Sequence, residues 1–261
     1  MQKSELTFDV IKALKEVSAK FQPDLFQVVK KELSVSDLKL LDYVFTTYYP
    51  EGNTKGRWYD SYHVLLSTHF AVQLERTNDL VSPLIIPGII LHDLGYTVLP
   101  DGSKKNWSTG QNRILHMQEG AAVAAKCLAE MGCYNPFEIG IIVEMVATHD
   151  NWILGIPTSD ADILALVDAD KVFIMSFLSF FKDWVSEIGH PADLSLQDFY
   201  RLRQDLFYQA QVPFTGLAKL WRERQFKARW QEIQQDILRN ETSFRQYAER
   251  HIRAELRAGR G

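Results

Sequence analysis

The feature that most constrains this chain is an adjacent His92 and Asp93 that directly follow an apolar run over residues 83–91. A segment this apolar is expected to be buried, and a buried carboxylate is costly unless it is paired or bound to a metal ion. Pro87 is typical of a helix start and Gly95 of a helix stop, which places the pair in the last turn of a short buried helix. Alone, such a pair is more often a core histidine bonded to an acid. Residues elsewhere in the chain are therefore needed to distinguish that arrangement from a metal site.

Composition narrows the class of protein. The 261 residues are 46% hydrophobic and 24% charged, as in a soluble globular protein with a substantial core. A net charge of -4 gives no overall basic field, so no nucleic-acid polymer is expected as a partner. Cys127 and Cys133 are too few for a disulfide framework or a thiolate zinc site. With no export signal and no long apolar stretch, we expect a cytoplasmic protein without a membrane partner.

Hydrophobic periodicity and turn signals predict an all-α fold in three parts. We expect an N-terminal helical segment over 1–56, a multi-helix core bundle over 57–190 and a C-terminal helical segment over 191–261. In the last segment Arg222, Arg224 and Arg229 are interleaved with acidic residues, which predicts a solvated face.

The predicted helix from Arg57 to Leu74 carries two histidines, His63 and His69. Six residues at about 100° each place them roughly 120° apart around the axis, so only one is expected to face a shared site. The local pattern does not choose between them.

Three later helices carry further metal-ligand residue types. His116 is followed by small residues suited to close helix contact, and His149 ends a helix opened by the Asn135-Pro136 cap. A helix over 163–181, with Ser159 and Asp162 as a possible capping box, carries two acids.

Those two acids have different helical neighbours. Asp170 has apolar residues three and four positions away on both sides, whereas Asp168 meets Lys171 at three positions as an ordinary ion pair. Asp170 is therefore the acid expected to be buried and to need a cation.

Taken in order, these residues resemble the HD superfamily of metal-dependent phosphohydrolases, whose pattern is a His, an adjacent His-Asp and a distant Asp. The resemblance covers roughly residues 57–181 and implies that His63 rather than His69 is the first ligand. It implies six metal ligands, His63, His92, Asp93, His116, His149 and Asp170. Imidazole and carboxylate ligands without thiolate suit one or two divalent ions among Mn, Fe, Co, Ni, Zn and Mg.

The chain departs from the family where many members have a lysine three residues after the Asp, because Tyr96 stands there. The group that contacts phosphate is therefore open among Tyr96, Arg57, Lys171 and the loop residues Lys104 and Lys105. The loop over 100–110 is either a simple surface loop or a flap that brings cations to an anionic substrate.

The resulting hypothesis is a metal-dependent phosphohydrolase that acts on a small phosphorylated compound, expected to be a nucleotide. A metal-bound hydroxide would attack phosphorus, with Asp93 bridging two ions and Lys171 stabilising charge on the phosphate. The alternatives are an HD-type di-iron oxygenase and a non-catalytic metal- or nucleotide-binding module. The sequence does not indicate an oligomeric state.

Overall fold

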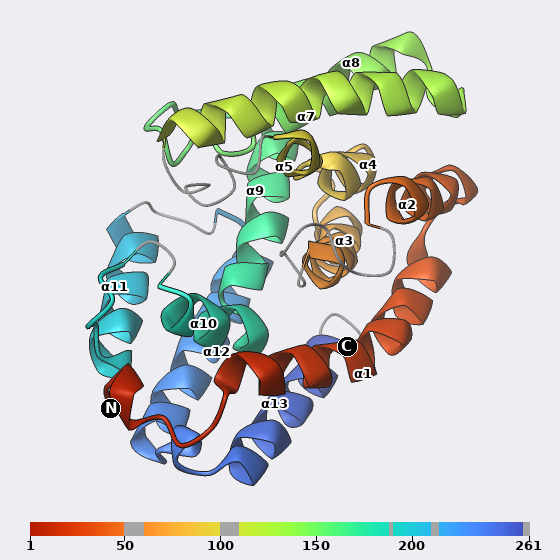
Figure 1. Ribbon diagram of the computed structural model, residues 1–261. Helices are drawn as coiled ribbons and strands as arrows, with labels where there is room; N and C mark the ends of the chain where they lie inside the picture. The colour runs from red at the N-terminus through yellow and green to blue at the C-terminus, as the bar shows by residue number, and fades with distance from the viewer. Residues whose placement is uncertain (50–59, 100–109, 188–189, 210–213, 258–261) are drawn as a thin grey trace. The chain divides into compact units, whose positions relative to one another are not determined.

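The computed structural model describes residues 1–49, 60–99, 110–187, 190–209 and 214–257, and every regular element within these ranges is a helix (Figure 1). The predicted all-α class is confirmed for this part of the chain. Over the same residues, no helix combines the length and the apolar character that crossing a membrane requires.

The chain forms two compact units, which we call the central unit (Phe26–Asp170) and the terminal unit (Met1–Leu25 with Lys171–Gly261). The divisions fall inside α1 (Val10–Glu32) and α9 (Ala161–Ile174). The three-part division expected from turn signals stays a prediction. The other central helices are α2 (Val35–Thr47), α3 (Asp60–Thr77), α4 (Ile85–Leu91), α5 (Gly95–Val98), α7 (Gly110–Met131) and α8 (Pro136–Thr148).

The short helix α4 lies at the core of the central unit. All seven of its residues are buried, and it contacts α2, α3 and α8. Complete burial of an aliphatic side chain contributes about 1.5–3 kcal/mol, so the apolar run is sufficient reason for α4 to be internal. Helices α7 and α8 lie side by side, and α5 packs against α7 (Figure 1).

The expected boundaries of α4 are partly wrong. The helix begins at Ile85, two residues before Pro87, and ends at Leu91, so His92 is its C-terminal cap and Asp93 lies just beyond it. Gly95 does not stop the helix; it opens α5. Its importance is steric, because a Cβ atom at Gly95 would lie 1.8 Å from the carbonyl oxygen of His116.

Two other helix predictions have opposite outcomes. The Asn135 cap is confirmed, since its side chain accepts hydrogen bonds from the backbone of Phe137 and Glu138. The continuous helix over 163–181 is wrong, because α9 ends at Ile174 and Ser176 caps the next helix, α10 (Phe177–Val185).

The start of α9 also differs from the predicted capping box. Asp160, rather than Ser159, accepts the backbone hydrogen bonds of Asp162 and Ile163. The Asp162 carboxylate instead accepts two hydrogen bonds from Ser82, at 2.6 and 2.7 Å. The predicted pairing of Ser159 with Asp162 is therefore replaced by a tertiary contact.

The terminal unit contains α10, α11 (Leu196–Gln209), α12 (Gly216–Gln234), α13 (Glu241–Glu255) and the short 3-10 turns Lys3–Glu5 and Ile237–Arg239. The solvated arginine face expected there is wrong for Arg222 and Arg229, which are both buried. Arg229 forms an ion pair of 2.6 Å with Glu232 and lies over the ring of Phe177. Its charge is thus compensated inside the unit.

Candidate metal centre

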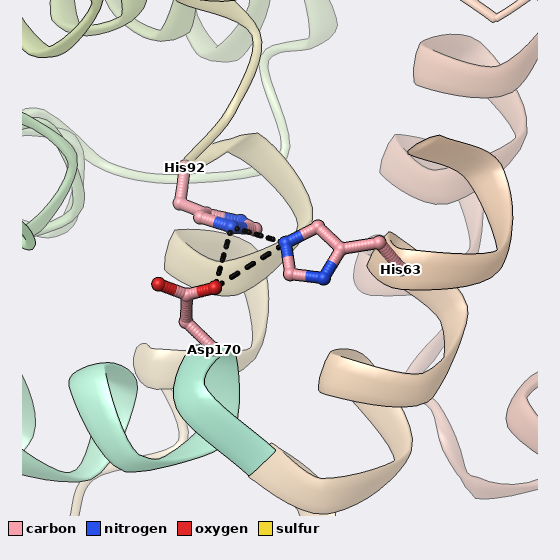
Figure 2. A group of neighbouring side chains, drawn as sticks. All are labelled: His63, His92 and Asp170. Carbon is pink, nitrogen blue, oxygen red and sulfur yellow. Dashed lines mark hydrogen bonds and ion pairs between the residues drawn. The ribbon is translucent and has the colours of Figure 1, made fainter. Parts of the chain in front are cut away.

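The central unit gathers the six predicted ligands into two neighbouring groups. The first ligand group is His63, His92 and Asp170, drawn in Figure 2. His63 Nε2 lies 3.0 Å from His92 Nε2 and 3.3 Å from Asp170 Oδ1. These side chains come from α3, the end of α4 and α9, and all three are buried. One ion placed among the three atoms would be bound by residues far apart in the sequence.

The second ligand group is Asp93, His116 and His149. His116 Nε2 lies 3.1 Å from His149 Nε2, and each of these atoms lies 4.0 Å from Asp93 Oδ1. The two histidines come from α7 and the end of α8, and both are almost fully buried. This group could hold a second ion.

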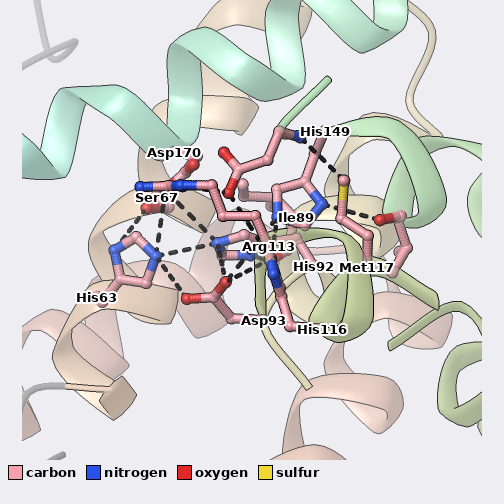
Figure 3. A network of polar contacts seen from close by, with 12 residues as sticks. His63, Ser67, Ile89, His92, Asp93, Arg113, His116, Met117, His149 and Asp170 are labelled. Atoms are coloured by element: carbon pink, nitrogen blue, oxygen red, sulfur yellow. Dashed lines mark hydrogen bonds and ion pairs between the residues drawn. The ribbon is translucent and has the colours of Figure 1, made fainter. Parts of the chain in front are cut away.

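Asp93 lies between the two groups (Figure 3). Its Oδ2 atom is 3.4 Å from His63 Nε2, and its Oδ1 atom is 3.6 Å from His92 Nε2. The same Oδ1 atom faces both histidines of the second group. The Asp93 carboxylate thus faces histidines of both groups, as a bridging ligand must.

The hydrogen bonds of the histidine Nδ1 atoms determine which ring nitrogen is available to a metal ion. The Nδ1 atoms of His92 and His149 lie 2.7 and 2.8 Å from the backbone carbonyls of Ile89 and Val146. His116 Nδ1 lies 3.3 Å from the Asn112 carbonyl. Because a carbonyl only accepts hydrogen bonds, each Nδ1 atom carries the hydrogen, and the neutral ring presents an unprotonated Nε2 atom.

This tautomer leaves two ring lone pairs facing each other in the second group. Burial lowers the pKa of His116 to about 3 and also lowers the pKa of His149, so both rings are neutral at physiological pH. Their Nε2 lone pairs then face each other at 3.1 Å with no hydrogen between them. Bonds of about 2.0–2.1 Å from two imidazole nitrogens to one ion explain such a separation. The residues present therefore fit a bound cation.

The first group has a different protonation state. Burial opposes a charge on His92, but the carboxylates Asp93 and Asp170 outweigh it and raise its pKa to about 9. A protonated His92 can donate through Nε2 to His63 Nε2, 3.0 Å away, which accounts for this short contact without an ion. A metal ion bound here has to displace that proton.

We therefore expect metal binding to release protons. At pH 7 the free protein carries the His92 proton and the complex does not, so binding should release about one proton per first-group ion. Apparent affinity should rise about tenfold per pH unit below about pH 9 and level off above it. Calorimetric titration with Mn²⁺ in buffers of different ionisation enthalpy, between pH 6 and 8, measures the release directly. Binding that is independent of pH across this range would contradict the assignment.

The structure separates the residues that the local pattern left equivalent. His69 points elsewhere and pairs with Glu32 at 2.8 Å, whereas His63 faces the centre. Asp168 is as buried as Asp170, so the expected difference in burial between the two acids is wrong. What distinguishes Asp170 is its direct contact with both histidines of the first group.

The structure describes only some of the predicted substrate-contacting residues. Arg57, Lys104 and Lys105 lie outside the described residues. Lys171 is buried and belongs to the terminal unit, so its catalytic role stays a prediction. Tyr96 is 4% exposed and stacks on His116, with ring centroids 4.1 Å apart and planes at 9°. Tyr96 thus contacts a predicted metal ligand, and its substrate role also stays a prediction.

Two charged residues that the sequence did not single out adjoin the second group. Asp150 Oδ2 lies 3.8 Å from His116 Nε2 and forms an ion pair of 2.6 Å with Arg113. The available signals were that Arg113 precedes His116 by three residues on one helix, and that His149-Asp150 repeats the His-Asp order of the central pair.

The chain was compared with protein-family models, with curated proteins and with solved structures. None of the three comparisons found a match, so the chemistry of the centre is inferred from its own geometry.

Proposed function

We propose that this protein is a metal-dependent phosphohydrolase of the HD type that acts on a small phosphorylated compound, expected to be a nucleotide. The observation that carries the proposal is Asp93, whose carboxylate faces both histidines of each ligand group. Two adjoining sites bridged by a carboxylate are typical of centres that hydrolyse phosphate esters. The resemblance of the ordered ligands to the HD superfamily supports the same reaction class.

Each part of the centre has a distinct task in this proposal. Divalent ions bound there would lower the pKa of a coordinated water and polarise a phosphoryl oxygen. The backbone carbonyls behind His116 and His149 fix their ring tautomers, so these two ligand nitrogens carry no hydrogen before the ion arrives. The Ile89 carbonyl holds the His92 ring in place by the same kind of hydrogen bond. Burial of the histidines keeps competing water away from the ligand atoms.

The two histidines of α3 provide a matched test. His63→Ala should lose first-group metal and more than about 100-fold of phosphatase activity, because even indirect partners of metal ligands cost 10–100-fold. His69→Ala removes an equally buried imidazole from the same helix but leaves the ligands intact, so metal content should be retained. Metal analysis and a panel of phosphomonoesters, nucleotides and cyclic dinucleotides provide the measurements.

The same measurements separate the alternatives. Equal metal content and activity in the two variants would overturn the proposed ligand role of His63. Paired iron with oxygen uptake and no phosphate release would favour the di-iron oxygenase. Metal-dependent melting without turnover on the whole panel would favour a binding module.

A further inference from the structure

Arg113 and Asp150 form a charged pair at the edge of the second ligand group. Arg113 Nη1 lies 2.6 Å from Asp150 Oδ2, and the same oxygen lies 3.8 Å from His116 Nε2. The guanidinium is thus separated from a proposed metal ligand by a single carboxylate oxygen. The pair comes from two elements, since Arg113 lies in the first turn of α7 and Asp150 follows α8.

Burial and the ion pair restrain both side chains. Asp150 is almost fully buried, and the side chain of Arg113 is 13% exposed. An ion pair of this length in a buried setting restrains the planar guanidinium, which keeps further N–H donors in a fixed fork. A fixed, partly exposed fork beside a metal centre is suited to an anion with several oxygens in one plane or tripod.

We propose that Arg113 is the phosphate-contacting cation of this centre and that Asp150 is the positioning residue that orients it. The inference rests on the proposed phosphohydrolase function and names the group that grips the substrate. The substrate's phosphoryl group would meet the second ligand group through one oxygen and Arg113 through another. Arg113 would then supply the charge that the family's lysine supplies where this chain has Tyr96.

The described residues favour this assignment over those made from the sequence. Tyr96 is stacked on His116 and buried, and it has no positive charge to offer. Lys171 is buried as well. Arg113, by contrast, lies on the same helix as His116 and one turn before it.

A competing explanation is that Arg113 only neutralises the buried Asp150, and a set of variants distinguishes the two roles. Arg113→Met removes the fork and leaves the Asp150 charge, whereas the double variant Arg113→Met/Asp150→Asn removes both charges. Arg113→Lys keeps a charge without the fork. Each protein is loaded with Mn²⁺, its metal content is measured, and inorganic phosphate is titrated as ligand and as inhibitor of phosphatase activity.

If Arg113 grips phosphate, Arg113→Met should weaken phosphate binding about 10- to 100-fold, as expected for a lost charge-assisted hydrogen bond. Metal content should be unchanged, and the double variant should stay impaired. Added guanidinium ion should restore part of the activity of Arg113→Met. The phosphate affinity of Arg113→Lys should lie between those of the wild type and Arg113→Met. Asp150→Asn alone should keep both ions but weaken phosphate binding.

Recovery of wild-type phosphate binding in the double variant would overturn the proposal, because neutralisation would then be the whole role. Loss of metal in Asp150→Asn would overturn the positioning role and make Asp150 a ligand. If the wild-type protein binds Mn²⁺ but neither binds nor releases phosphate, the proposed function itself fails and this inference fails with it. If the wild-type protein hydrolyses phosphate esters and Arg113→Met does so equally well, the inference about Arg113 fails while the proposed function stands.

Discussion

Asp93→Asn is expected to abolish metal binding at both ligand groups and to reduce phosphatase activity by more than about 1000-fold. The substitution keeps the size of the side chain but removes the charge that faces histidines of both groups. A neutral amide is a poor ligand for two cations at once, and its NH₂ group would face the lone pairs of the neutral histidines. Loss of the bridging residue should therefore reduce phosphatase activity more than loss of a ligand to one ion. For a ligand to one ion we expect a reduction of at least about 100-fold.

The comparison with two other carboxylates makes this expectation specific. Asp170→Asn should weaken the first group while the second retains its ion, because Asp170 belongs to the first ligand group, where it faces His63 and His92. Asp37→Asn is a control in the same unit, since Asp37 is buried and accepts a hydrogen bond of 2.8 Å from Tyr134, away from both groups. Metal analysis of the three purified variants decides the matter. Two ions retained by Asp93→Asn would contradict a bridging role.

The core of this centre could be predicted because burial and charge conflict in the sequence itself. An apolar run that ends in His92-Asp93 has to be buried, and the buried acid has to find a cation. Once several helices each carry one such residue, their convergence is the economical solution. The structure does bring those six side chains together.

Other features depend on contacts that no local pattern contains. His69 differs from His63 because Glu32, at the end of α1, is there to pair with it. Asp168 and Asp170 are both buried, so their neighbours on the helix could not separate them by exposure. The pairing of Arg113 with Asp150 joins residues 37 positions apart in the chain.

The break between α9 and α10 was missed for a different reason. Ser176 accepts a hydrogen bond from the backbone of Ser179, which is an ordinary helix cap. Its signal in the sequence was masked by continuous apolar residues on both sides, which read as one helix. A short polar residue inside an apolar stretch therefore has to be weighed as a possible helix start.

The second large effect is expected from Gly95→Ala, at the first residue of α5. A Cβ atom at this position would lie 1.8 Å from the His116 carbonyl oxygen and 2.8 Å from the Gly120 backbone nitrogen. Both contacts are with backbone atoms, which cannot rotate away, so α5 has to move off α7. Because Asp93 lies two residues before Gly95, that movement separates Asp93 from His116.

We expect Gly95→Ala to lower the free energy of unfolding by about 3 kcal/mol or more, at the upper end of the usual cost of overpacking, and to lose second-group metal. Gly140→Ala is the matched control, because Gly140 is an exposed position inside α8 and its Cβ would meet no heavy atom within 4 Å. A glycine in an exposed helix interior costs about 0.8–1 kcal/mol relative to alanine, so this variant should be stabilised by that amount. Urea unfolding and metal titration of the two variants measure both effects. A Gly95→Ala protein as stable as the wild type, with its metal intact, would mean that α5 and α7 do not meet as closely as described.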